Sequence, residues 1–298
     1  MIDTETVSEN PNEAGPKPPF PEQHQSAPGI ETRMRPRPDH GEHTYQGQNK
    51  LTGKVALITG GDSGIGKAVA IAFAREGANV AIAHMPDEES DAADTMGWIQ
   101  KAGRRALSLP GDLSDGEYCR NIVERTVAEL GRIDILVNNA GFSHNRRSIL
   151  EMPFEEWDYT FKVNLYSLFH TCKAAIPHMR PGSAIINVAS VETFEPDPHA
   201  LAYSTSKGAI VTFTKSLGGE VIGKGIRVNV ICPGPFWTPL TTVSMDPKLT
   251  ANYGHQTQMK RPGQPREAAP LFVLLASDDG SFIANEVFVI AGGMPMPS

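Results

Sequence analysis

From about Leu51 onward, the apolar residues of this chain follow two alternating patterns. Short apolar runs are candidate strands, at residues 55–58, 79–83, 106–109, 135–138, 184–188, 227–231 and 287–290. Longer segments with apolar residues three and four positions apart are candidate helices, including residues 65–76, 118–130, 157–176 and 203–222. Strands that alternate with helices form parallel sheets covered on both faces. The pattern therefore predicts a single doubly wound α/β domain with a seven-stranded parallel sheet.

The first fifty residues follow neither pattern. Pro, Gln, His, Glu and Arg dominate them, and their apolar residues are too sparse to build a core that would offset the entropy of ordering. We therefore expect residues 1–50 to form an extended or partly disordered N-terminal arm and residues 51–298 to form the folded domain. Phe20, Met34 and Tyr45 are spaced anchors for docking the arm on a folded surface. We expect residues 1–16 to be mobile and the stretch from Pro18 onward to be ordered.

A glycine-rich turn follows the first candidate strand. Between this strand and the next helical pattern lies the sequence Thr59-Gly60-Gly61-Asp62-Ser63-Gly64-Ile65-Gly66. Glycine has no side chain to keep a ligand away from the backbone, and the N-terminus of a helix favours an anion. The turn is therefore a candidate site for the pyrophosphate of a dinucleotide. The alternative is an ordinary strand-to-helix connection.

A second pattern combines a tyrosine, a lysine and a serine. Tyr203 and Lys207 are four residues apart in a predicted helix, so their side chains would emerge on one face. Ser190 lies thirteen residues before the tyrosine, at the end of a predicted strand. An ammonium group near a phenol lowers the phenol's pKa from about 10 toward neutral pH, as a general acid-base group requires. The alternative is an amphipathic helix with an exposed tyrosine and lysine.

Together these two patterns resemble those of the classical short-chain dehydrogenases/reductases. The resemblance extends from about Leu51 to Gly293, and the motifs occur in the family's order. They are the glycine turn with the spacing Gly-x-x-x-Gly-x-Gly, Asp112, Asn138-Asn139-Ala140-Gly141, Asn164, Ser190, Tyr203, Lys207 and Pro233-Gly234. The resemblance implies a Rossmann fold in which cofactor and substrate meet at the carboxyl ends of the strands.

The resemblance also implies roles for individual residues. In carbonyl reduction Ser190 would hydrogen-bond the carbonyl oxygen, Tyr203 would donate the proton, and Lys207 would stabilise the phenolate. Asn164 would position a water that relays protons to the lysine. The residues implied to bind the nicotinamide cofactor are Gly60, Ser63, Gly64, Ile65, Gly66, His84, Asp112, Leu113, Asn138, Ala140, Gly141, Tyr203, Lys207, Pro233, Gly234 and Thr238. The implied reaction is hydride transfer between NAD(P) and a small-molecule carbonyl or alcohol substrate.

The sequence leaves the choice between NAD and NADP open. In NAD-using relatives a carboxylate at the end of the second strand accepts the adenosine 2′-hydroxyl. His84 occupies that place in this chain, with Asp62 and Glu88 nearby. The histidine would either contact a phosphate or cap the strand. The prediction is therefore NAD(P).

The N-terminal arm narrows the resemblance. Its sequences Pro19-Phe20-Pro21-Glu22-Gln23 and Gln25-Ser26-Ala27-Pro28-Gly29 look like those of a bacterial subgroup described as general-stress oxidoreductases, aldehyde reductases or glucose-dehydrogenase-like proteins. These descriptions leave a sugar, an aldehyde or a ketone as substrate. The family resemblance implies a homotetramer, in which we expect the arm to contact a neighbouring subunit. The alternative functions are a non-catalytic dinucleotide-binding sensor, which typically lacks one of the four catalytic residues, and a scaffold.

The composition argues against several other classes of protein. A formal charge of -7 without a basic stripe speaks against a nucleic-acid partner. Three scattered cysteines, Cys119, Cys172 and Cys232, indicate buried thiols in a reducing compartment, and the nine histidines form no paired metal-ligand motif. No apolar stretch reaches membrane-spanning length, and the acidic start is unlike a signal peptide. We therefore expect a cytoplasmic protein without a metal centre or membrane contact.

Overall fold

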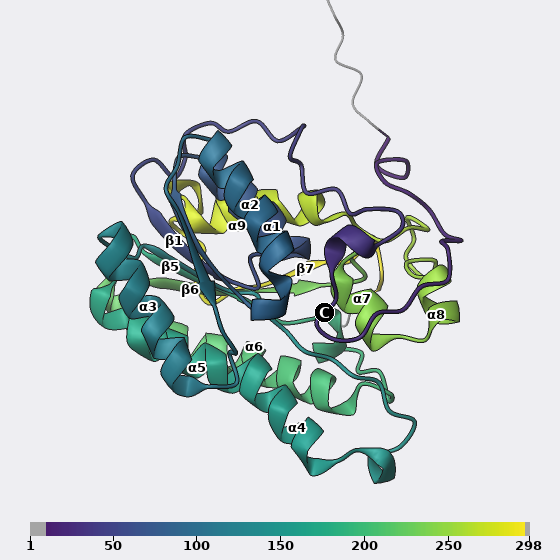
Figure 1. Cartoon of the computed structure of the whole chain (residues 1–298). Coiled ribbons are helices and arrows are strands. Elements are labelled where there is room, and N and C mark those ends of the chain that lie inside the picture. The colour runs from purple at the N-terminus through teal and green to yellow at the C-terminus, as the bar shows by residue number, and fades with distance from the viewer. Residues whose placement is uncertain (1–9, 296–298) are drawn as a thin grey trace, which may run out of the picture.

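The computed structural model describes residues 10–295 of the chain. Their central layer is a sheet of seven parallel strands in the order β3-β2-β1-β4-β5-β6-β7 (Figure 1). The strands are β1 (Val55–Thr59), β2 (Asn79–His84), β3 (Ala106–Pro110), β4 (Ile135–Asn138), β5 (Ala184–Val188), β6 (Arg227–Pro233) and β7 (Val287–Ile290). The predicted fold is confirmed. The strand order reverses between β1 and β4, which marks the edge where ligands of such sheets bind.

Helices cover both faces of this sheet (Figure 1). One face carries α1 (Gly64–Arg75), α2 (Glu89–Lys101) and α9 (Pro265–Ala276). The other face carries α3 (Gly116–Leu130), α4 (Phe154–Phe161), α5 (Ser167–Ala175) and α6 (Leu201–Val221). Two short helices, α7 (Pro239–Ser244) and α8 (Pro247–Ala251), follow β6 at the carboxyl edge of the sheet. They stand where a substrate would approach that edge.

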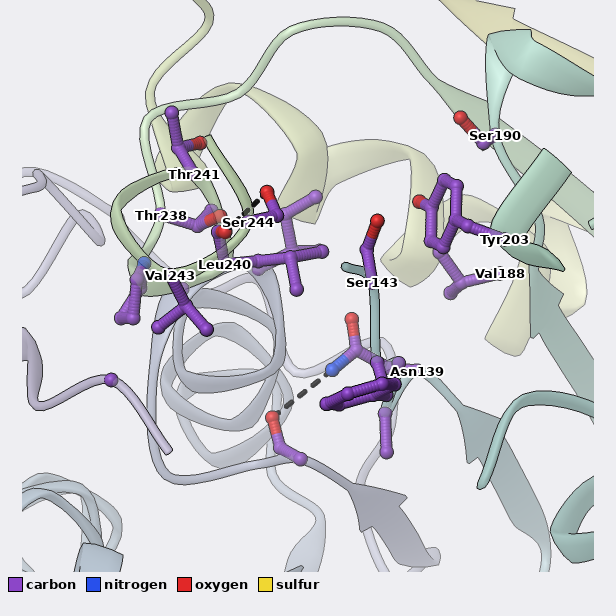
Figure 2. A pocket seen from close by; sticks show the side chains of 18 of the residues that line it. Asn139, Ser143, Val188, Ser190, Tyr203, Thr238, Leu240, Thr241, Val243 and Ser244 are labelled. Carbon is purple, nitrogen blue, oxygen red and sulfur yellow. Dashed lines mark hydrogen bonds between the residues drawn. The ribbon is translucent and has the colours of Figure 1, made fainter. Parts of the chain in front are cut away.

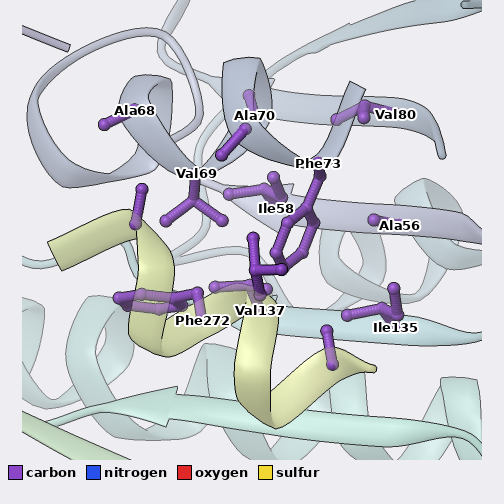
Figure 3. Packing of buried hydrophobic residues seen from close by; sticks show 14 of the residues in the cluster. Ala56, Ile58, Ala68, Val69, Ala70, Phe73, Val80, Ile135, Val137 and Phe272 are labelled. Atoms are coloured by element: carbon purple, nitrogen blue, oxygen red, sulfur yellow. The ribbon is translucent and has the colours of Figure 1, made fainter. Parts of the chain in front are cut away.

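Alternate residues of each strand face opposite helix layers. In β1, Ile58 belongs to the apolar cluster beneath α1 and α9, whereas Leu57 belongs to the cluster on the side of α3, α5 and α6. Figure 3 shows the first cluster, in which Phe73 of α1 and Phe272 of α9 lie over Val137 of β4. Strands that are buried on both faces read as continuous apolar runs. The predicted strand ends therefore agree with the observed ones within two residues.

The single helix predicted over residues 157–176 needs a correction. The structure divides it into α4, a π-helical turn at Lys162–Tyr166, and α5. Within the π turn, the Asn164 Oδ1 accepts from the backbone N–H of Phe142 at 2.7 Å, and its Nδ2 donates to the Phe142 carbonyl oxygen at 3.0 Å. These contacts to a distant loop leave no mark on the apolar period. Such turns are frequent at functional sites.

The N-terminal arm lies on the folded domain, beside α7 and α8 (Figure 1). Phe20 and Met34 are buried with Trp237 in a small apolar cluster, where the ring centroids of Phe20 and Trp237 are 4.3 Å apart. The Tyr45 hydroxyl donates to Glu76 Oε1 at 2.6 Å. All three expected anchor residues therefore make their contacts within the chain itself.

The expected limit between mobile and ordered arm residues also needs a correction. Residues 1–9 lie outside the described residues, so their mobility remains an expectation. Residues 10–16 contact the domain, because Arg261 Nη2 donates to the Pro11 carbonyl oxygen at 2.6 Å and Arg266 Nη2 donates to the Ala14 carbonyl oxygen at 2.8 Å. The partners in each pair are separated by about 250 residues. Local composition near the N-terminus therefore gives no sign of these contacts.

Candidate active site

A cavity of about 700 Å³ opens at the carboxyl ends of the strands. Its walls are the glycine turn after β1, the loops after β2 to β6, α7 and part of the arm. In Figure 2, Ser190 and Tyr203 lie on one side of the cavity, and the α7 residues Leu240 and Val243 lie on the other. Both the size and the position beside the β1–β4 switch are typical of a ligand site.

The glycine turn has a backbone geometry that requires glycine. Gly60 and Gly64 have φ angles of +62° and +51°, in the left-handed region. A Cβ atom on Gly66 would lie 1.8 Å from the Gly60 carbonyl oxygen, so α1 can pack against the turn only with glycine there. Gly60, Ser63, Gly64 and Ile65 line the cavity. Gly66 lies behind this wall and acts through packing.

Three of the four predicted catalytic residues line the same cavity. Ser190 follows β5, while Tyr203 and Lys207 lie one turn apart on α6. The Lys207 Nζ is 5.3 Å from the centroid of the Tyr203 ring and donates to the Val188 carbonyl oxygen at 2.9 Å. The four-residue spacing therefore places the tyrosine and the lysine on the face of α6 that borders the cavity, as the sequence predicts.

Asn164, the fourth predicted catalytic residue, is buried behind the cavity wall. Besides its two bonds to Phe142, its Nδ2 lies 2.9 Å from the Ser206 hydroxyl, to which it donates. A Cβ atom on Gly141 would lie 3.4 Å from Lys207 Nζ and 3.8 Å from Asn164 Oδ1. The asparagine therefore ties the loop after β4 to α6 beside Lys207. Its proposed part in a proton relay stays a prediction.

The adjacent residues Asn138 and Asn139 face different surroundings. Asn138, predicted to border the cofactor, points toward α5, where its Oδ1 accepts from the Thr171 hydroxyl at 2.8 Å, and its Nδ2 donates to Asn187 Oδ1 at 2.9 Å. Asn139, absent from the predicted site, lines the cavity and donates to the carbonyl oxygens of Thr59 and Gly60, each at 3.0 Å. Neighbouring residues of a strand point to opposite sides, so only one of the pair reaches the turn. The sequence alone does not reveal which one.

The other residues predicted to bind the cofactor line the cavity as well. They are His84, Asp112, Leu113, Ala140, Gly141, Pro233, Gly234 and Thr238. A Cβ atom on Gly64 would lie 3.0 Å from Thr238 Cγ2, so the start of α7 touches the glycine turn. The motifs that are scattered along the sequence thus meet at one cavity. Their individual binding roles remain predictions.

Comparisons with known proteins agree with this arrangement. A family model described as enoyl-(acyl carrier protein) reductase matches residues 60–295. The chain belongs to the short-chain dehydrogenase/reductase family. It is 47% identical over 272 residues to the uncharacterized oxidoreductase YhdF of Bacillus subtilis (strain 168), a match that covers 91% of this chain and 94% of the relative.

Two further similarities concern the cofactor of relatives. The chain is 41% identical over 272 residues to NADPH-dependent aldehyde reductase 1, chloroplastic, of Arabidopsis thaliana, covering 89% of this chain and 94% of the relative. A solved short chain dehydrogenase from Burkholderia cenocepacia J2315, in complex with NADP, is 31% identical with a TM-score of 0.77. That match covers 82% of this chain and 98% of the other. The family assignment makes this protein an oxidoreductase of CH–OH and C=O groups with NAD(P) as its cofactor class.

The cavity of this short-chain dehydrogenase/reductase has polar groups that fit a dinucleotide. The backbone N–H of Ile65, in the first turn of α1, has no protein acceptor among residues 10–295. Within the same residues, the buried Oδ2 of Asp62 has no hydrogen-bond partner. The first group suits a phosphate oxygen and the second suits a hydroxyl of a ribose. A dinucleotide offers both.

Burial controls the titration of Tyr203 and Lys207 in the protein alone. Burial and the charge of Glu192 raise the pKa of Tyr203, and hydrogen bonding with Ser190 offsets only part of this rise. Burial lowers the pKa of Lys207 to about 8. The expected lowering of the tyrosine pKa by the lysine is therefore not found in the protein alone, because desolvation disfavours the charged form of both groups.

Glu192 is a titratable cavity residue outside the predicted catalytic and cofactor-binding sets. Its Oε2 accepts from the Ser204 hydroxyl at 2.6 Å, and burial raises its pKa to about 7. The signal in the sequence is its position two residues after Ser190, on the short 3-10 helix Val191–Thr193. Its charge near the tyrosine and the lysine changes around neutral pH.

The structure distinguishes between the two alternatives for His84, a phosphate contact and a cap of the second strand. Its side chain is fully buried, with Nδ1 2.9 Å from the Met85 carbonyl oxygen and Nε2 2.8 Å from the Ser108 hydroxyl. Both ring nitrogens therefore have partners in β3 or in the histidine's own loop. This geometry favours the strand-capping alternative over a phosphate contact.

The part of the cavity near the ends of β2 and β3 is acidic. Asp62, Asp87, Glu88 and Asp112 line it. Burial, with the charge of Glu31, raises the pKa of Asp62 to about 6, and burial, with the charge of Asp62, raises the pKa of Glu88 to about 8. Among the described residues that line the cavity, Lys207 is the only lysine or arginine.

Metal ligands and membrane-spanning helices are not found in the described part of the chain. Within residues 10–295, no three His, Cys, Asp or Glu side chains are grouped so as to hold a metal ion. None of the helices in this range is long and apolar enough to cross a membrane. Cys119, Cys172 and Cys232 are buried free thiols, as the sequence predicts.

Proposed function

We propose that this short-chain dehydrogenase/reductase is a cytoplasmic enzyme that transfers a hydride between NAD(P) and a carbonyl or alcohol carbon of a small molecule. The observation that carries the proposal is the single cavity that joins the glycine turn to Ser190, Tyr203 and Lys207. The turn would hold the pyrophosphate, and the tyrosine would face the reacting oxygen. Such a cavity brings a dinucleotide and its substrate together.

In the reducing direction, the residues of the cavity would handle the proton. The bound nicotinamide supplies the hydride. Ser190 Oγ, which also accepts from the backbone N–H of Glu192 at 3.2 Å, would donate a hydrogen bond to the carbonyl oxygen. The Tyr203 hydroxyl would donate its proton to the same oxygen, and the Lys207 ammonium would stabilise the resulting phenolate. Asn164 would position a water that relays a proton to the lysine.

The alternative function is a sensor or scaffold that binds the dinucleotide without turnover. The intact set of Asn164, Ser190, Tyr203 and Lys207 favours the enzyme. The deciding experiment offers aldehydes, sugars, ketones and alcohols with NADH, NADPH and their oxidised forms, and follows nicotinamide absorbance. Turnover with one substrate class supports the proposal and names the class. Dinucleotide binding without turnover across a broad panel would support the sensor.

We further propose that this enzyme prefers NAD(H) to NADP(H). An adenosine 2′-phosphate in the acidic part of the cavity would lie near the Asp62 carboxylate, with no lysine or arginine of that wall to pair with it. A 2′-hydroxyl would instead give the unpartnered Asp62 Oδ2 a donor. We expect NADH to bind at least about tenfold more tightly than NADPH in fluorescence titrations, since one charge contact is worth about 1.5 kcal/mol or more.

A matched pair of variants tests the cause of this preference. Asp62→Asn removes a buried charge. The dissociation constant for NADPH divided by that for NADH should therefore decrease severalfold. Asp87→Asn removes an exposed charge on the rim of the same cavity, where water and salt screen it, and should leave the ratio nearly unchanged. Equal affinity of the wild type for NADH and NADPH would contradict the preference.

We also propose that the enzyme is a homotetramer. The family resemblance implies this assembly, and the chain offers apolar surface for it: Phe154 of α4 and Phe169 of α5 are exposed, and Phe282 before β7 is fully exposed. A neighbour contact of the arm would use its exposed residues, because Phe20, Met34 and Tyr45 already pack within the chain. Light scattering of the full chain should give the mass of four subunits.

Removal of the arm is expected to weaken the protein. A chain that starts at Lys50 would expose the apolar surface that Phe20 and Met34 cover, so its melting temperature and its tetramer stability should both fall. Thermal unfolding and light scattering, with the full chain as control, measure the two effects. If the shortened chain keeps both the mass and the melting temperature, the arm is a passive tail.

A further inference from the structure

A carboxylate of the arm is buried at the start of the glycine helix. Glu31 is only 3% exposed, and its Oε2 accepts from the backbone N–H of Gly64, the first residue of α1, at 2.7 Å. The same oxygen lies 2.8 Å from His40 Nε2, and Oε1 accepts from Lys67 Nζ at 2.9 Å. Both carboxylate oxygens therefore have charged or backbone donors.

The surroundings of Glu31 keep it ionised. Burial raises the pKa of this carboxyl, but His40, Lys67 and the N–H of Gly64 together outweigh burial and hold the pKa below its ordinary value. Lys67 also pairs with Asp94 at 2.8 Å, which fixes the lysine between two carboxylates. A negative charge at a helix N-terminus is further favoured by the helix dipole. Glu31 is therefore ionised, and both oxygens of its carboxylate have hydrogen-bond donors.

Glu31 also takes up one of the backbone donors at the start of α1. The first N–H groups of a helix have no acceptor within the helix. Glu31 occupies that of Gly64, and the N–H of Lys67 donates to the Ser63 carbonyl oxygen at 3.0 Å. The N–H of Ile65, on a residue that lines the cavity, is left without an acceptor in the described part of the chain. An anion in the cavity would find this donor at a fixed place.

The residues just before Glu31 form a wall of the same cavity. Residues 27–29 line it, and their backbone packs closely on α7. A Cβ atom on Gly29 would lie 2.7 Å from Val243 Cγ2, and the backbone N–H of Gln25 donates to the Thr242 carbonyl oxygen at 3.0 Å. In Figure 2, Val243 and its neighbours on α7 lie across the cavity from Tyr203. One arm segment therefore joins the start of α1 to α7.

We propose that Glu31 is a positioning residue for the dinucleotide, which holds the glycine turn and α7 in place at the cavity before the cofactor binds. The inference rests on the proposed dinucleotide binding at this cavity. A site that is ordered in advance loses less conformational freedom on binding, so its affinity is higher. The arm then contributes to cofactor affinity although it lies outside the glycine turn and the catalytic residues.

The test is Glu31→Gln. Glutamine has the same size and can still accept from Gly64, but it lacks the charge that Lys67 and His40 pair with. Since a hydrogen bond to a charged group contributes about 1.5 kcal/mol or more, the dissociation constant for NADH should rise about tenfold in fluorescence or calorimetric titration. At saturating cofactor kcat should stay within about twofold of the wild type, because the proton-handling residues are untouched.

Tyr45→Phe is the matched control. Tyr45 belongs to the same arm and contacts the same helix, but its hydroxyl bonds Glu76 at the opposite end of α1, away from the cavity. This variant should have a lower melting temperature than the wild type, while its dissociation constant for NADH stays within about twofold of the wild-type value. A merely structural role of the arm would shift NADH affinity equally in both variants.

A second variant keeps the test decisive if Glu31→Gln does not fold. Gly29→Ala places a methyl group against Val243 and pushes the arm wall away from α7 with Glu31 intact, so NADH affinity should fall severalfold. Unchanged NADH affinity in Glu31→Gln would overturn the proposed role of the arm in cofactor binding. If only Gly29→Ala folds, unchanged NADH affinity in that variant has the same meaning. A wild type that binds neither NADH nor NADPH would instead refute the proposed function, and this inference with it.

Discussion

Replacement of Tyr203 by phenylalanine is expected to lower kcat for carbonyl reduction by about 10² or more, because the variant keeps the ring and loses the proton donor. The dissociation constant of the dinucleotide should change by less than about twofold, since the hydroxyl is proposed to act on the substrate oxygen. The raised pKa of Tyr203 supports this role, because the group stays protonated at neutral pH until a partner takes its proton. Steady-state kinetics and cofactor titration measure the two quantities separately.

Tyr253→Phe is the matched control for this variant. Tyr253 also lines the cavity, and burial raises its pKa to about 12, so it is a second, partly buried phenol near the first. Its loss should change kcat by less than about tenfold, because the proposed mechanism gives it no proton to donate. Near-normal turnover in Tyr203→Phe with a large loss in Tyr253→Phe would show that Tyr253, and not Tyr203, donates the proton.

Lys207→Met is expected to have opposite effects on activity and stability. Methionine keeps most of the side-chain length but loses the charge that would stabilise the phenolate, so kcat should fall by about 10² or more. Cofactor affinity should fall as well, because Lys207 is also one of the residues implied to bind the nicotinamide cofactor. The folded protein, however, no longer has to bury an ammonium group whose pKa burial lowers to about 8. The inactive variant should therefore melt at a higher temperature at pH 7.

The pH dependence gives the sign of this stability effect. The unfolded chain binds a proton at Lys207 up to its ordinary pKa of 10.5, whereas the folded chain loses it near 8. The free energy of unfolding of the wild type therefore rises with pH across this interval, and the full cost, on the order of 3 kcal/mol, is present below pH 8. The advantage of Lys207→Met should shrink from pH 8 to 10.5. A lower melting temperature of the variant at pH 7 would contradict this account.

The sequence was sufficient for the parts of the site that depend on local pattern. All seven strands are visible as apolar runs, because the inner strands β1, β4, β5 and β6 are buried on both faces and the partly exposed edge strands β3 and β7 still carry apolar residues. The spacing of Tyr203 and Lys207 within one helix fixes their common face without further information. The glycine turn is similarly local. Gly60 and Gly64 are required by their φ angles, and Gly66 by its contact with the Gly60 carbonyl oxygen in the same connection.

The missed features depend on contacts between distant segments. Glu31 reaches Gly64 only because the arm docks beside α1, and a lone glutamate in a proline-rich stretch looks like any solvated residue. Asn139 and Asn138 are identical neighbours, so the strand's orientation alone decides which one reaches the turn. The pKa of Tyr203 likewise follows from burial, which raises it, whereas the lysine was expected to lower it. A five-residue motif gives no information on burial.

The docked arm also sets an order of events during synthesis. Phe20 stacks on Trp237, and Pro11 accepts hydrogen bonds from Arg261 across 250 residues of chain. The ribosome makes the arm first and these partners among the last segments, and chains fold progressively as they emerge. The part of the arm around Pro11 and Phe20 must therefore wait for these partners until most of the polypeptide has been made, whereas Glu31 and Tyr45 contact α1, which is made early. A translation product that ends before Trp237 would contain the glycine turn and Tyr203 but would lack the partners of Phe20 and Pro11.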